Sequence, residues 1–75
     1  MGKLVIDRPG MNALYRERVE AADARIRQHH TGEPAQTVRW IAQQEFAHAG
    51  LVLPPGDLFG YAQSVWLDTD FVLKA

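Results

Sequence analysis

The 75-residue sequence predicts a mainly α-helical fold in which three helices form one compact domain over residues 1–75. Apolar residues recur at helical spacing in three segments, and glycine and proline separate these segments. In addition, 47% of the residues are hydrophobic, which is ordinary for a globular domain and too high for a disordered chain. We therefore expect helices over residues 11–30, 34–49 and 57–67, with the first two antiparallel.

The two ends of the chain carry similar short apolar runs. The first, Leu-Val-Ile, lies within residues 1–10 and is followed by the breaker Arg-Pro-Gly. The second, Phe-Val-Leu, lies within residues 70–74. Each run is typical of a strand or an extended arm. We expect the two to pair as a small sheet supported by the helices, because two strands alone are marginally stable.

The first helix has one apolar face. Its members recur every three or four residues and are Met11, Tyr15, Val19, Ala22, Ile26 and His29. Asn12 is placed to cap the start of the helix, and Asp23 and Arg27 form an i,i+4 pair in the favourable order. We expect His29 to be half-buried in the seam with the second helix and His30 to be solvated.

The second helix cannot hide all its apolar surface on one face. One side carries Val38, Ile41, Ala42, Glu45, Phe46 and Ala49. Trp40 and Ala47 point to the opposite side, and a tryptophan is costly to leave in water. Trp40 therefore either packs under the terminal segments or anchors a partner, and the sequence leaves both interpretations open. If Glu45 on the apolar face is buried, it needs a partner; we expect it either to pair with Arg18 or Arg25 on the first helix or to lie at a solvent-exposed edge.

Glycine and proline delimit the second and third helices. Gly32 and Pro34 form the turn before the second helix, and Gly50 is placed as its C-terminal cap. After the prolines at positions 54 and 55, Asp57 is a favourable N-cap for the third helix. Its predicted apolar face consists of Leu58, Tyr61, Ala62, Val65 and Trp66, with Gly60, Gln63 and Ser64 on the polar side.

Composition restricts the location and chemistry of the protein. There is no cysteine, the net charge is −1, and no apolar run approaches the ~20 residues that span a bilayer. The N-terminal residues lack the apolar stretch of a signal peptide, so we expect a cytoplasmic protein that does not bind a membrane. A chain this short buries little surface on folding, which favours a homodimer or a bound partner. We expect no cofactor.

Catalysis and metal binding have weak support. The single serine, Ser64, has no nucleophile-elbow sequence around it, and the sequence has no phosphate-binding loop. We therefore expect that the protein is not an enzyme. One alternative is a metal-binding helical dimer through Glu45 and His48, whose Glu-x-x-His spacing occurs in di-iron bundles.

The residues favour a small, non-catalytic regulator or inhibitor that binds a protein partner and occludes it. We expect its binding site to contain Trp40, Arg39, Gln43, Leu53 and Phe59. Arginine outnumbers lysine and alanine is frequent, which is typical of a bacterial chain or one encoded by a phage or plasmid. Anti-CRISPR-type inhibitors have a similar size and composition, and this analogy makes one of them an alternative identity.

A second alternative is a transcriptional regulator that binds DNA as a dimer. Its contacts would come from Arg16, Arg27 and Arg39. The predicted third helix contains no arginine or lysine, so it is unsuited to reading bases in a helix-turn-helix arrangement.

Overall fold

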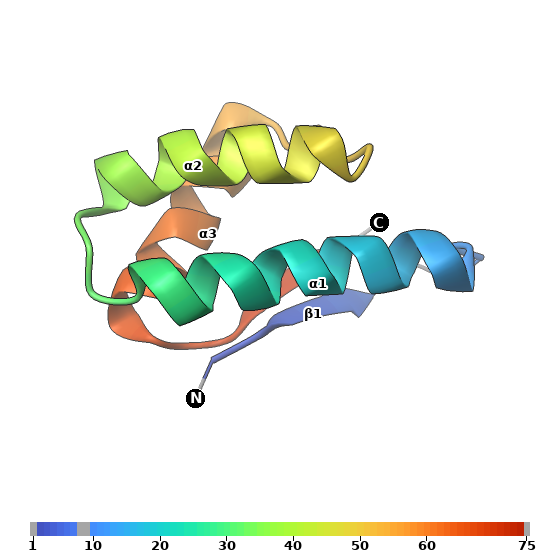
Figure 1. Ribbon diagram of the computed structural model, residues 1–75, viewed down its shortest axis with the longest axis horizontal. Helices are drawn as coiled ribbons and strands as arrows, with labels where there is room; N and C mark the ends of the chain where they lie inside the picture. The colour runs from blue at the N-terminus through green and yellow to red at the C-terminus, as the bar shows by residue number, and fades with distance from the viewer. Residues whose placement is uncertain (1, 8–9, 75) are drawn as a thin grey trace.

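Three helices lie between two short strands along the chain (Figure 1). The elements are, in chain order, β1 (Leu4–Asp7), α1 (Ala13–His30), α2 (Ala35–His48), α3 (Pro55–Leu67) and β2 (Phe71–Lys74). This computed structural model describes residues 2–7 and 10–74. The helix α2 packs on both α1 and α3, while β1 contacts α1 and β2 contacts α3. The predicted mainly helical fold, with its first two helices side by side, is confirmed.

The start of α1 is capped as its sequence predicts. The side-chain oxygen of Asn12 accepts hydrogen bonds from the backbone amides of Leu14 at 2.8 Å and Tyr15 at 3.3 Å. The first amides of a helix have no partner inside the helix, so this side chain stabilises the first turn.

The end of α2 reverses the chain through a left-handed glycine. Gly50 has a φ of +89°, and its amide donates to the carbonyl oxygen of Ala47 at 3.0 Å. The amide of Leu51 donates to the carbonyl oxygen of Phe46 at 2.8 Å, which completes a Schellman motif. Leu51 is thereby turned into the core, whereas Val52 remains exposed. This reversal directs the following segment back along α2.

The predicted N-cap of α3 is wrong. The helix begins at Pro55 with Pro54 in the cap position, so Asp57 lies inside the first turn. Proline fits this first helical position because its missing amide hydrogen would have had no partner there and its φ is already helical.

The terminal segments pair as a two-stranded parallel sheet. Leu4 is opposite Phe71, and the register continues to Asp7 opposite Lys74. The predicted pairing of the two runs is confirmed, and the strands run in the same direction, which the long connection through three helices permits. Leu4, Ile6 and Leu73 are buried against the helices, whereas Val72 is exposed.

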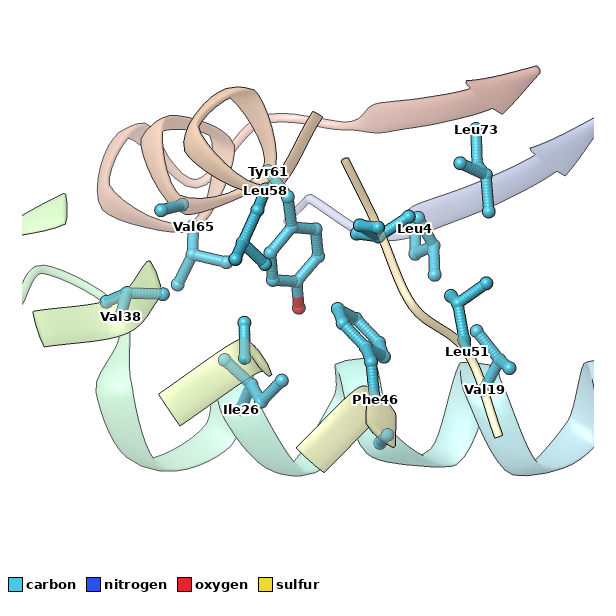
Figure 2. Close-up of a cluster of buried hydrophobic side chains, with 14 of the residues drawn as sticks. Leu4, Val19, Ile26, Val38, Phe46, Leu51, Leu58, Tyr61, Val65 and Leu73 are labelled. Carbon is cyan, nitrogen blue, oxygen red and sulfur yellow. The ribbon is translucent and has the colours of Figure 1, made fainter. Parts of the chain in front are cut away.

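Buried side chains from every element form one hydrophobic core (Figure 2). Its members are Leu4, Ile6, Val19, Ala22, Ile26, Val38, Ala42, Phe46, Leu51, Leu53, Leu58, Tyr61, Ala62, Val65 and Leu73. Tyr61 lies at the centre, with its ring edge-to-face to Phe46 at 4.9 Å and to Phe71 at 5.8 Å between centroids. Such pairs of aromatic rings add stability beyond the area they bury.

Four side chains differ from their predicted burial. Trp66 is exposed, although the sequence placed it on the apolar face of α3, and Ser64 is buried although it was placed on the polar face. His29 is exposed rather than half-buried, and His30 is half-buried with its Nδ1 2.6 Å from Oε2 of Glu33. The physical reason is that the neighbours of a helix, and not its periodicity alone, decide where the covered face ends.

Candidate functional site

Trp40 is exposed on the outer face of α2. Its relative exposure is 64%, whereas Val38, Ala42 and Phe46 on the opposite face are buried. The terminal strands lie against α1 and α3, so they do not cover this face of α2. Of the two interpretations of Trp40, packing beneath the terminal segments is therefore wrong.

A hollow of about 200 Å³ opens beside Trp40. It is lined by Arg39, Trp40, Gln43, Leu53, Pro55 and Leu58. One wall is the outer face of α2, and the other is the chain that the Gly50 turn sends back toward the start of α3.

A second hollow of about 110 Å³ continues the first along α2. Its lining residues are Gln43, Phe46, Ala47, Leu51, Val52, Leu53 and Leu58. The two hollows share Gln43, Leu53 and Leu58, so they form one concave surface. We call this surface the Trp40 groove and define it by the residues that line the two hollows.

The Trp40 groove combines apolar side chains with hydrogen-bond donors. The aromatic ring of Trp40 and the aliphatic side chains of Val52 and Leu53 offer apolar contact, while Arg39 and Gln43 supply donors at one side. Tryptophan and arginine are enriched among the residues that dominate the energy of protein interfaces. Among the residues that the structure describes, none of those lining the groove is a carboxylate, histidine or serine that could act as an acid, base or nucleophile.

Most of the predicted partner-binding residues meet in this groove. Trp40, Arg39, Gln43 and Leu53 all line the hollow beside Trp40. Phe59 is exposed on α3 and lines neither hollow. Sequence reasoning missed three exposed groove residues, which are Ala47, Val52 and Pro55. Ala47 could have been found, because it lies four residues after Gln43 and shares its helical face.

The three arginines of the DNA-binding alternative differ in their contacts and in their exposure. Arg27 is buried and its Nε donates to Oδ1 of Asp23 at 2.8 Å, so its guanidinium holds the fold together. Arg16 is half-buried, and its Nη1 donates to the carbonyl oxygen of Ile6 at 3.3 Å. Arg39 alone among the three is exposed.

Glu45 forms the predicted ion pair between the first two helices. Its Oε2 lies 3.2 Å from Nη2 of Arg25, which confirms one of the two predicted partners. Both side chains remain partly exposed, so Glu45 lies at the edge of the apolar face, and the ion pair is not buried. Within residues 2–7 and 10–74, Glu45 and His48 belong to no cluster of three or more histidine, aspartate or glutamate side chains suited to a metal.

A buried polar cluster joins three elements. Oδ1 of Asp23 on α1 accepts from Arg27 and, at 2.6 Å, from the hydroxyl of Tyr61 on α3. Its Oδ2 accepts from the backbone amide of Leu4 at 2.9 Å, and Nη2 of Arg27 donates to Oγ of Ser64 at 3.1 Å. Burial, and next the charge of Asp23, raise the pKa of Tyr61 far above its ordinary value.

The buried cluster borders a hollow of about 350 Å³. Its lining includes Gly2, Lys3, Asp23, Arg27 and Asp68. The carboxylate of Asp68 accepts from the amide of Gly2 at 3.0 Å, and Nη1 of Arg27 donates to the carbonyl oxygen of Thr69 at 2.9 Å. These polar groups serve to fasten the N-terminal segment to the turn before β2, which is a structural task.

Comparison of the chain with models of protein families, with curated proteins and with solved structures gives no match. Among the described residues, no helix combines the length and the apolar character needed to cross a bilayer.

Proposed function

We propose that this protein is a small, non-catalytic regulator that binds a protein partner in the Trp40 groove and thereby occludes a surface of that partner. The observation that carries the proposal is the exposure of Trp40, at 64%, beside a hollow whose far wall is built by residues from another part of the chain. An exposed tryptophan at the edge of a concave apolar surface is a typical anchor of an interface.

The groove indicates which chemistry its partner presents. The exposed side chains of Trp40 and Val52, with the nearly buried Leu53 beneath them, suit a segment with large apolar side chains. Arg39 at the hollow beside Trp40 suits a carboxylate at one end of that segment, since arginine pairs with carboxylates through two parallel hydrogen bonds. The proposed ligand is therefore a protein segment that combines apolar side chains with one acidic residue.

The DNA-binding alternative has less support. The net charge of the chain is −1, and Arg27 is committed to the buried ion pair with Asp23. Affinity for DNA comes mainly from cations that neutralise phosphates. We expect no binding of a fluorescent duplex even at low salt, and a salt-sensitive complex would favour this alternative.

The proposal keeps the cytoplasmic location and the bacterial, phage or plasmid origin that composition favours. A chain without cysteine is suited to a reducing compartment. An inhibitor of the anti-CRISPR type is one specific form that such a regulator would take.

A photo-crosslinking amino acid at position 43 tests the proposed site. Gln43 is exposed and lines both hollows, so a partner in the groove would be captured there in bacterial cells that carry the gene. Mass spectrometry then identifies the captured protein, and calorimetry measures the affinity of the purified pair.

Trp40→Ala and Trp66→Ala form a matched pair of variants for this experiment. Both tryptophans are exposed, but only Trp40 lines the groove. We expect Trp40→Ala to weaken the affinity for the identified partner at least tenfold, and Trp66→Ala to leave it unchanged. Equal affinities for the two variants would show that the partner binds elsewhere.

A further inference from the structure

The hydrogen bonds between β1 and β2 define which edge of each strand faces outward. The amide of Phe71 donates to the carbonyl oxygen of Lys3 at 3.0 Å, and Leu4 is opposite Phe71 in the register. In a parallel pair, alternate residues direct both their amide and their carbonyl toward the neighbouring strand. Phe71 and Leu73 of β2 therefore face β1, and Val72 directs its backbone groups to the opposite edge. On β1, the residues that face outward are Leu4 and Ile6.

The outer edge of β1 is covered by side chains of α1. Oδ2 of Asp23 accepts from the amide of Leu4 at 2.9 Å. Nη1 of Arg16 donates to the carbonyl oxygen of Ile6 at 3.3 Å. These contacts satisfy backbone groups that another strand would need, so β1 is closed to further pairing.

The outer edge of β2 has no such cover. Within the described part of the chain, no group bonds to the outward amide or carbonyl of Val72. The Val72 side chain is itself 46% exposed. An uncovered strand edge is a template for pairing with another strand, and a sheet of only two strands gains stability when strands are added.

We infer that a second copy of this chain pairs with β2 in an antiparallel arrangement around a two-fold axis at Val72. The two sheets would then join as one four-stranded sheet in the order β1-β2-β2-β1. The amide and carbonyl of Val72 would exchange hydrogen bonds with those of Val72 in the second copy. A two-fold axis requires a self-complementary surface, and this edge meets that requirement.

Charge supports the same register. Centring the antiparallel pair on position 72 sets Asp70 of one copy, whose Oδ1 also accepts from the amide of Lys3 at 3.0 Å, opposite position 74 of the other, which is a lysine. Because of the two-fold symmetry, this juxtaposition of opposite charges occurs at both ends of the new pairing. An apolar valine lies at the centre between them. The sequence Asp70 to Lys74 is therefore complementary to itself when the second copy runs in the opposite direction.

Mass in solution tests the inference, with two lysine variants as a matched pair. We expect light scattering to give the wild type twice its monomer mass of 8.4 kDa. Val72→Lys would place two like charges directly opposite each other at the axis and should give a monomer. Leu14→Lys introduces the same charge at an apolar side chain that is 57% exposed on α1, outside both the sheet and the Trp40 groove, and we expect it to remain a dimer. Circular dichroism checks that both variants are folded.

A single introduced cysteine provides a second measurement that does not depend on disrupting the dimer. The chain has no cysteine of its own, and position 72 would meet itself at the two-fold axis. Val72→Cys should therefore give a disulfide-linked dimer under mild oxidation, whereas Leu14→Cys should give far less. Loss of this crosslink in denaturant would show that it depends on the folded dimer.

Four results would overturn the inference. The first three are a wild type that stays at 8.4 kDa up to millimolar concentration, a Val72→Lys variant that remains a dimer, and a Val72→Cys variant that crosslinks no better than Leu14→Cys. Trp40→Ala separates this inference from the proposed function, because it removes the anchor of the groove and should leave the dimer mass unchanged. A monomeric Trp40→Ala variant would show that the groove, and not β2, joins the two copies.

Discussion

The hydroxyl of Tyr61 donates a 2.6 Å hydrogen bond to Oδ1 of Asp23, and both side chains are buried. This bond links the centre of α3 to α1, and Figure 2 shows the Tyr61 hydroxyl directed toward α1. The same carboxylate holds the amide of Leu4 and the guanidinium of Arg27. The carboxylate of Asp23 therefore joins α1, α3 and β1.

Tyr61→Phe should lower the free energy of unfolding by about 1.5–3 kcal/mol, because Asp23 loses a hydrogen bond to a charged group. Tyr15→Phe makes the same chemical change at a half-buried site, where the hydroxyl donates to the carbonyl oxygen of Gly50 at 3.0 Å. That neutral bond should contribute only about 0.5–1.5 kcal/mol. Urea unfolding measures both variants, and a larger loss for Tyr15→Phe would contradict the central role of Tyr61.

The raised pKa of Tyr61 predicts loss of stability in alkali. The unfolded chain releases the Tyr61 proton near the ordinary pKa of about 10, while the folded chain retains it because burial, and next the charge of Asp23, raise the pKa. The contribution to stability is full below pH ~10 and is lost as the pH rises toward the folded value. The free energy of unfolding should fall by about 1.4 kcal/mol for each pH unit in this window.

Absorbance of the tyrosinate ion measures this effect in the Tyr15→Phe variant, in which Tyr61 is the only tyrosine left. We expect the tyrosinate signal and the loss of helical circular dichroism to appear at the same pH. Ionisation of Tyr61 in a chain that keeps its full helical signal would contradict its burial.

Arginine-to-methionine variants should show that the buried ion pair contributes more to the free energy of unfolding than the partly exposed one. Arg27→Met leaves the buried carboxylate of Asp23 without its ionic partner, which typically costs about 3–5 kcal/mol. Arg25→Met removes the pair with Glu45, which is partly exposed and should contribute about 0–1 kcal/mol. Thermal and urea unfolding test this order. Similar losses for the two variants would mean that Asp23 finds water or another partner when Arg27 is absent.

Trp40→Ala should leave the fold nearly intact. The side chain is 64% exposed, so its removal should change the free energy of unfolding by less than about 1 kcal/mol. Phe46→Ala on the same helix is the control, because Phe46 is fully buried and its truncation should cost about 3–5 kcal/mol. If Trp40→Ala were as destabilising as Phe46→Ala, the tryptophan would belong to the core and the proposed anchor would be lost.

The sequence indicated which residues of the groove share a face where they lie on one helix. Trp40 and Gln43 are three residues apart, so helical periodicity alone places them on one face. Leu53 was predicted from the stiffness and apolar character of its loop, and the structure brings it to the same hollow. Phe59 is the exception, because no local pattern shows which side of α3 the returning loop covers.

The sequence by itself determined the three helices, the turns between them and the placement of Trp40 on the helix face opposite Val38 and Phe46. These features depend on local causes, which are the 3.6-residue period, the preference of glycine and proline for turns, and the caps at Asn12 and Gly50. Only the tertiary structure decided the parallel direction of the strands, the burial of Asp23 with Arg27, and the exposure of Trp66. The physical reason is that burial depends on which distant segment packs over a residue. In the sequence, Asp23 and Arg27 resemble an ordinary surface pair, but β1 and α3 cover them in the fold.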